Sequence, residues 1–174
     1  MKALRIGISS CLLGDEVRWD GGHKLAGWLG DFANVEWVRV CPEMEIGLGV
    51  PREPIRLVRE GSRIALRGVD SNTDVTERMA DWSGRFLAGL DDLDGYVLKS
   101  RSPSCGLRDV PVEGDTTAGR GLFAEELVRA HPELPVAEET DLGTREGRER
   151  FVARARAYRR GRRARRARDG ADSR

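Results

Sequence analysis

The sequence has few of the residues that mark several protein classes. Its 174 residues include only three cysteines, two histidines and two tyrosines. An odd number of cysteines argues against a disulfide framework, and no run reaches the roughly 18 apolar residues that a membrane span needs. The segment before Cys11 is too short and too interrupted for a signal peptide. We therefore expect one unprocessed, cytoplasmic domain with no membrane partner.

Charge is distributed unevenly along the chain. Residues 145–174 contain thirteen arginines and four acidic residues, a net charge of +9, whereas the other 144 residues carry −8. From Arg159 onward no apolar residue is larger than alanine. We expect a domain of residues 1–158 and a frayed or disordered arginine-rich tail of residues 159–174. Such a tail is usually solvated, although its charge also suits a phosphate backbone.

Strand patterns alternate with helix patterns along the domain. The expected strands are residues 4–9, 35–40, 95–99 and 134–137, and the expected helices are residues 25–32, 75–90, 122–130 and a final one after residue 144. Residues 55–58 and 63–66 flank a turn and indicate a hairpin. The pattern predicts an α/β fold with three layers and a mainly parallel, Rossmann-like sheet, with one hairpin excursion.

Each cysteine follows a predicted strand. Cys11, Cys41 and Cys105 all stand where a strand gives way to a loop. Because ligands bind at the carboxyl ends of the strands in open α/β sheets, we expect the three thiols to meet at one rim. Their spacing fits no paired Cys-x-x-Cys zinc motif. The alternative is that they are small buried apolar residues with no shared role.

Three convergent thiolates favour a soft metal, either zinc, Cu(I) or an iron–sulfur cluster. A cubane cluster normally takes four cysteines, so three would leave one iron without a protein ligand. Such an iron is a Lewis acid that can hold a substrate atom. A zinc ion bound by three cysteines is the competing site, with His23 as its fourth ligand.

Groups suited to acid–base chemistry accompany the cysteines. Glu43 and Glu45 follow the second cysteine, and either carboxylate could carry a proton or simply be solvated. Ser102 and Ser104 precede the third cysteine, where they could cap a helix or donate hydrogen bonds to a substrate. Lys99 could balance the charge of the thiolates.

Five motifs occur in order along the chain. They are SCLLG at 10–14, RWDGGHK at 18–24, VCPE at 40–43, GLGVPR at 47–52 and LKSRSPSCG at 98–106. Together they resemble the thiouracil desulfurase family, over about residues 4–158. This likeness implies an oxygen-sensitive [4Fe–4S] cluster whose ligands would be Cys11, Cys41 and Cys105.

The resemblance also implies a reaction. The open iron would take the sulfur of a thiolated uracil, and water would replace that sulfur at carbon, giving uracil and sulfide with no net electron transfer. The family's acid–base carboxylate maps to Glu43 and its active-site serine to Ser102, with Glu45 and Ser104 as close rivals. The groups that we expect to contact substrate are Ser104, Asp20, His23 and Lys99.

Two other functions compete with a free thiobase as substrate. Residues 41–49 look more like family members that carry an additional C-terminal domain and act on 4-thiouridine in tRNA, and the arginine-rich tail could contact such an RNA. The second alternative is a zinc- or nucleotide-binding α/β module without catalysis. The sequence indicates no oligomeric state.

Overall fold

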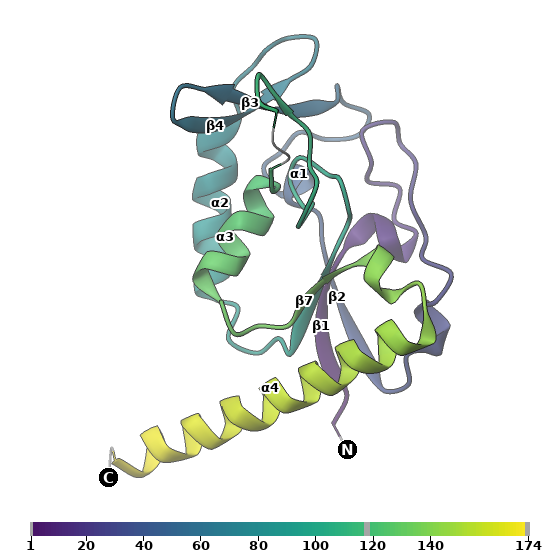
Figure 1. The fold of residues 1–174 in the computed structure, drawn as a ribbon, viewed down its shortest axis with the longest axis vertical. Helices are drawn as coiled ribbons and strands as arrows, with labels where there is room; N and C mark the ends of the chain where they lie inside the picture. The colour runs from purple at the N-terminus through teal and green to yellow at the C-terminus, as the bar shows by residue number, and fades with distance from the viewer. Residues whose placement is uncertain (1, 117–118, 173–174) are drawn as a thin grey trace.

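A four-stranded parallel sheet forms the centre of the protein, which a computed structural model describes for residues 2–116 and 119–172 (Figure 1). The strand order is β2-β1-β5-β7. The strands are Leu4–Ser9 (β1), Val35–Val40 (β2), Gly95–Leu98 (β5) and Val136–Glu138 (β7). The two central strands are buried almost throughout, as expected for a parallel sheet that is covered on both faces.

A second, smaller sheet contains the predicted hairpin. Strands β3 (Ile55–Glu60) and β4 (Arg63–Gly68) pair antiparallel, and β6 (Val112–Glu113) pairs parallel with β3. The two-residue connection begins at Gly61, whose φ of 62° suits a tight hairpin turn because glycine has no Cβ to clash there. The predicted hairpin excursion is confirmed.

Helices cover both faces of the parallel sheet. Helices α2 (Thr76–Ala88) and α3 (Leu122–Ala130) lie on one face, and α4 (Arg145–Asp172) packs on the other (Figure 1). The short elements are α1 (Pro42–Glu45) and the 3₁₀ helices η1 (Ser10–Leu13), η2 (Leu29–Asp31) and η3 (Glu139–Leu142). Within the described residues, no helix is both long enough and apolar enough to span a membrane.

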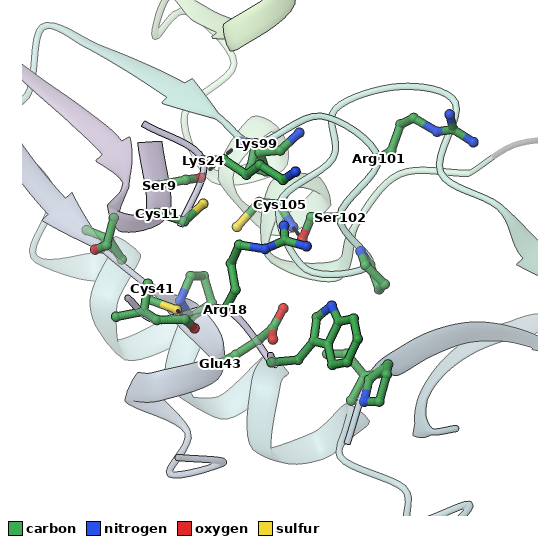
Figure 2. A pocket seen from close by; sticks show the side chains of 18 of the residues that line it. Ser9, Cys11, Arg18, Lys24, Cys41, Glu43, Lys99, Arg101, Ser102 and Cys105 are labelled. Carbon is green, nitrogen blue, oxygen red and sulfur yellow. Dashed lines mark hydrogen bonds between the residues drawn. The ribbon is translucent and has the colours of Figure 1, made fainter. Parts of the chain in front are cut away.

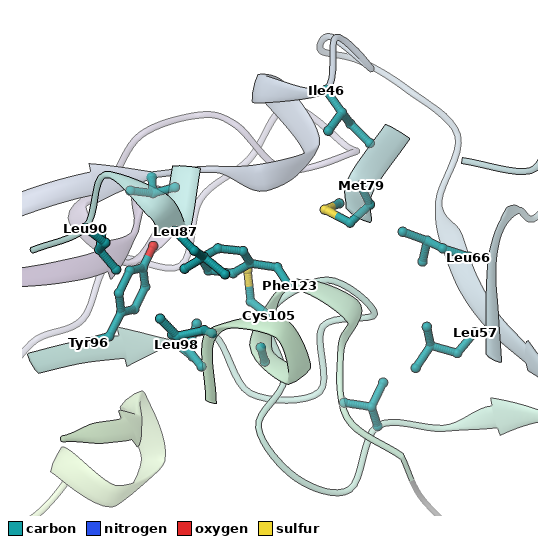
Figure 3. Packing of buried hydrophobic residues seen from close by; sticks show 14 of the residues in the cluster. Ile46, Leu57, Leu66, Met79, Leu87, Leu90, Tyr96, Leu98, Cys105 and Phe123 are labelled. Carbon is teal, nitrogen blue, oxygen red and sulfur yellow. The ribbon is translucent and has the colours of Figure 1, made fainter. Parts of the chain in front are cut away.

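Two apolar cores hold the three layers together. On one face, Tyr96 and Leu98 of β5 pack with Phe123 of α3, and the side chain of Cys105 is part of this cluster (Figure 3). On the opposite face, Ile8 of β1 packs with Phe151 of α4. The predicted three-layer α/β architecture is confirmed.

The helix expected at residues 25–32 does not form. Only the 3₁₀ turn η2 occurs there. Gly27 and Gly30 weaken a helix at this position, and the aromatic rings are held instead by mutual packing. The rings of Trp28 and Phe32 have centroids 5.5 Å apart, and both contact Trp37.

The expected disorder from Arg159 is corrected for the part of the tail that the structure describes. Helix α4 continues without a break to Asp172, whereas residues 173–174 lie outside the described residues. Arg159 Nε and Arg162 Nη2 donate to the carboxylate of Asp94 at 3.0 and 2.8 Å. The Asp94 side chain is only 1% exposed. Ion pairs to a buried carboxylate therefore extend the docked part of the helix beyond its last large apolar residues.

Asp94 should therefore anchor the end of α4. Its carboxylate also accepts the Arg5 N–H at 2.9 Å. Asp94→Ala leaves two partly buried guanidinium groups without their partner, so we expect a loss of about 3 kcal/mol in the free energy of unfolding, measured by urea denaturation. The control is Asp92→Ala, because the side chain of Asp92 is 59% exposed and its pair with Arg5 should contribute about 1 kcal/mol or less. Equal losses in the two variants would contradict the anchoring role.

Candidate functional site

The strand order reverses at β1, because β2 lies on one side of it and β5 on the other. Such a switch point is where open α/β sheets bind ligands. Cys11 lies in η1 directly after β1, Cys41 follows β2, and Cys105 lies in the loop after β5. All three line one cavity of about 330 Å³ (Figure 2). The predicted meeting of the three cysteines at one rim is confirmed.

The three thiols are neighbours in an environment that disfavours charge. Burial raises the pKa of Cys11 to about 11, and the adjacent Cys41 adds to this shift. Burial likewise raises the pKa of Cys41. The pKa of Cys105 lies well above its ordinary value because of burial, with smaller contributions from Cys41 and Cys11. Burial therefore disfavours the thiolate form at all three positions unless positive charge nearby compensates for it.

The start of α3 fixes the loop that carries Cys105. The backbone N–H groups of Leu122 and Ala124 donate to loop carbonyl oxygens at 3.0 and 3.2 Å. These are donors that the first turn of a helix cannot satisfy internally. The Ser102 hydroxyl oxygen accepts the N–H groups of Ser104 and Cys105 at 3.2 and 3.0 Å. Ser102 thus organises a turn, as a capping serine would, although no helix follows.

Ser9 links β1 to the same loop. Its buried hydroxyl oxygen accepts the Lys99 N–H at 3.0 Å. The Ser9 side chain also lowers the pKa of Cys105 and partly offsets the effect of burial. Ser9 therefore lies at the junction of β1, Lys99 and the loop that carries Cys105.

Glu43 is held rigidly at the cavity wall. Pro42 begins α1, and Glu43 follows it in the first turn. One carboxylate oxygen accepts a hydrogen bond from Arg52 Nε at 2.9 Å, and the other accepts the Ser104 hydroxyl at 3.0 Å. The side chain of Arg52 is 6% exposed and that of Glu43 15%. This buried ion pair fixes the orientation of the carboxylate.

Basic side chains surround the thiols. Arg18, Lys24, Lys99 and Arg101 all line the cavity (Figure 2). Lys99 is engaged by its neighbours, because its ammonium group donates to Ser100 Oγ at 3.0 Å and pairs with Glu139. Arg18 pairs with Asp20 at 3.5 Å, and the positive charge of Lys24 and Arg101 leaves this end of the sheet suited to an anionic group.

The structure separates the expected site residues into two groups. The three cysteines, Glu43, Ser102 and Lys99 line the cavity, and Ser104 is buried behind Glu43. Asp20, His23 and Glu45 are not among the lining residues. The Asp20 carboxylate accepts the Gly22 N–H at 3.0 Å, and His23 Nδ1 accepts the Leu25 N–H at 3.2 Å. Both side chains thus stabilise their own loop.

Residue-level reasoning missed several groups at this cavity, including Arg18 and Lys24. Arg52, Trp19 and Ser9 all line it. Arg52 lies in the GLGVPR motif and Trp19 in the RWDGGHK motif. The motifs themselves therefore indicated that these two residues belong to the site. For Ser9, the sequence predicts only that it is the last residue of a buried strand.

The donor geometry differs from that of a single-ion site. Across residues 2–116 and 119–172, no three His, Cys, Asp or Glu side chains are grouped so that they could hold one metal ion. The thiols nevertheless share one cavity. Three thiols at one cavity are a donor set that both zinc and iron–sulfur clusters accept.

A family model described as 2-thiouracil desulfurase matches residues 6–139. The chain belongs to this family. All three cysteines, Glu43 and Ser102 lie within the matched residues, and helix α4 lies outside them. The 2-thiouracil desulfurase family is a family of enzymes, so the cavity is the candidate active site of an enzyme.

The chain is also similar to two individual proteins. Uncharacterized protein YbbK from Bacillus subtilis (strain 168) is 30% identical over 134 residues, which are 71% of this chain and 89% of YbbK. A solved structure of the [4Fe-4S]-dependent thiouracil desulfidase TudS is 32% identical, with a TM-score of 0.59. The match covers 80% of this chain and 93% of that one.

Gly121 should be required for the position of Cys105. A Cβ at Gly121 would lie 2.5 Å from the carbonyl group of Ser104 and 2.8 Å from the Cys105 nitrogen. Gly121→Ala must displace the loop, so we expect a destabilisation of about 1–3 kcal/mol by chemical denaturation and a reduced iron content after anaerobic reconstitution. Gly84→Ala is the matched control, since its Cβ meets nothing within 4 Å and a helix favours alanine. A Gly121→Ala protein with normal stability and iron content would contradict this role.

Proposed function

We propose that this protein is a [4Fe–4S]-dependent desulfidase that converts thiouracil, or a related thiolated base, and water into uracil and sulfide. Cys11, Cys41 and Cys105 would hold the cluster. The convergence of these thiols from three adjacent strand ends on one cavity carries the proposal. Membership of the 2-thiouracil desulfurase family and similarity to the [4Fe-4S]-dependent desulfidase TudS support it.

The residues present fit such a cofactor. The donors are all sulfur, which favours iron–sulfur binding, and the surrounding cations offset the negative charge of thiolates. Three protein ligands are one fewer than a cubane cluster normally takes. When bound, the cluster therefore supplies an iron without a protein ligand, a Lewis acid for the sulfur of the substrate.

Glu43 is placed to handle the proton of the attacking water. The reaction forms a C–O bond and breaks a C–S bond, sulfur leaves as sulfide, and no electron is gained or lost overall. Water must lose a proton as it attacks carbon, and the Glu43 carboxylate accepts that proton. Arg52 and Ser104 orient this carboxylate through hydrogen bonds of 2.9 and 3.0 Å.

Ser102 is the better placed of the two candidate serines. Its side chain lines the cavity, whereas that of Ser104 is fully buried against Glu43. The Ser102 hydroxyl oxygen accepts hydrogen bonds from two backbone N–H groups. Its own hydroxyl proton can therefore be donated to the pyrimidine ring of the substrate. We assign substrate contact to Ser102 and a positioning role to Ser104.

The position of α4 disfavours the tRNA alternative in its expected form. Arg159 donates to the carbonyl oxygen of Lys2 at 2.7 Å, and Arg162 donates to that of Asp91 at 2.9 Å. These acceptors lie just before β1 and β5, at the amino ends of the strands, whereas the cavity is at the carboxyl ends. An RNA held by the arginine-rich helix would have to reach around the sheet to present its base.

A site of this kind fits a reducing compartment. Three partly or fully buried free cysteines around an iron–sulfur cluster require conditions in which thiols stay reduced. We therefore retain the cytoplasm as the proposed location.

Cluster content and activity should depend equally on all three cysteines. Because the chain has no fourth cysteine, replacing Cys11, Cys41 or Cys105 by alanine leaves no substitute ligand. The wild type, reconstituted without oxygen, should contain about four iron and four sulfide per chain and release sulfide from 2-thiouracil. Each alanine variant should lose both properties, as measured by iron and acid-labile sulfide assays.

Ser83→Ala is the matched control, because it removes a buried hydroxyl of α2 that lies outside the cavity. It should retain cluster and turnover. A colourless wild-type protein that binds zinc and releases no sulfide would refute the proposed function and favour the non-catalytic module.

Glu43 should be required for turnover but not for cluster binding. Glu43→Gln keeps the shape of the side chain and removes its ability to accept a proton, so we expect kcat to fall by about 100-fold or more. Iron and sulfide content should stay at the wild-type level. Glu45→Gln, two residues along and outside the cavity, should behave as the wild type. The reverse result, with Glu45 essential and Glu43 dispensable, would overturn this assignment.

A further inference from the structure

One tryptophan is exposed where the others are packed. The residue accessibility of Trp19 is 44%, whereas Trp28, Trp37 and Trp82 pack against the two cores. Trp19 also lines the cavity that contains the three cysteines. An exposed indole at a cavity wall offers an apolar π-face on which a flat ligand can stack.

The backbone around Trp19 is fixed before any ligand binds. The Trp19 carbonyl oxygen accepts the Arg52 N–H at 3.0 Å, and a turn closes through bonds from Gly21 to Arg18 at 3.0 Å and from Arg18 to Gly22 at 3.2 Å. Arg52 is the residue that holds Glu43. Trp19 is therefore tied to the same anchor as the proposed proton acceptor, which lowers the cost of ordering it on binding.

We infer that Trp19 is a substrate-binding residue whose indole stacks on the face of the thiolated pyrimidine. The inference rests on the proposed function and names the group that recognises the ring. Stacking of a base on an aromatic side chain does not depend on which edge atoms the base carries, because every base has a π-face. Trp19 should therefore hold the ring equally well with sulfur at either ring position, leaving the choice of position to the polar groups.

A competing explanation is that Trp19 belongs to an apolar patch for a protein partner. Met44 and Val50 are each 37% exposed, and Gly21 in the Trp19 turn lies close to Val50. Neither Met44 nor Val50 lines the cavity. Base stacking is favoured because, of these three residues, Trp19 alone lines the cavity. The two explanations predict different effects of replacing Val50, which should weaken binding only if the apolar patch is the binding surface.

The test compares Trp19→Leu with Trp19→Phe in the reconstituted holoenzyme. Leucine keeps apolar bulk without a π-face, so KM for both 2-thiouracil and 4-thiouracil should rise by about 5-fold or more, with kcat little changed. The Kd of uracil, measured by equilibrium dialysis, should rise by the same factor. Phenylalanine keeps a π-face and should change these constants by less than about 3-fold.

Val50→Ala is the matched control and should leave KM and Kd unaltered. Unchanged constants in Trp19→Leu, while the wild type turns over thiouracil, would refute stacking and leave the proposed function intact. Equal losses in Val50→Ala and Trp19→Leu would also refute it, in favour of the apolar patch. A wild type that releases no sulfide from either thiouracil and binds no uracil would refute both proposals together.

Discussion

Parallel pairing of β1 with both β2 and β5 is the constraint on which the site depends. Ser9 is paired with Val40, and Ile8 is paired with Val97, so the three strands end at the same edge. Two of the cysteines follow within two residues of those ends. A change of register in either pairing would move a thiol along the strand direction by about 3.3 Å per residue, which is more than a metal–sulfur bond can tolerate.

The third cysteine depends on packing between a loop and a helix. Cys105 stands several residues beyond the end of β5, so pairing alone does not place it. The first turn of α3 and the Ser102 hydroxyl fix the backbone of its loop. The pair of Glu43 and Arg52 performs a similar function for α1, where a buried ion pair specifies one geometry rather than adding much stability.

Much of the fold follows from local patterns, and much of the site does not. The spacing of Phe123 and Leu127 predicts α3, and the residues around Gly61 predict the hairpin. Cys11 and Cys41 meet because each follows the end of a strand, whereas the loop before α3 places Cys105 beside them. The ion pair of Arg52 with Glu43 depends on the conformation of the irregular loop between α1 and β3. That conformation has no periodic pattern of apolar residues from which it could be predicted. The extension of α4 escaped prediction because its docking uses ion pairs to Asp94 rather than apolar side chains.

Helix α4 lies beyond the residues by which the family is recognised, yet it completes the apolar core on one face of the sheet. Phe151 and Ala155 cover the strand residues Ile6 and Ile8 on that face. A fragment cut at residue 139 would present those side chains to water and would be prone to aggregate. The folded unit is thus longer than the segment that the family model matches, because α4 supplies part of its apolar core.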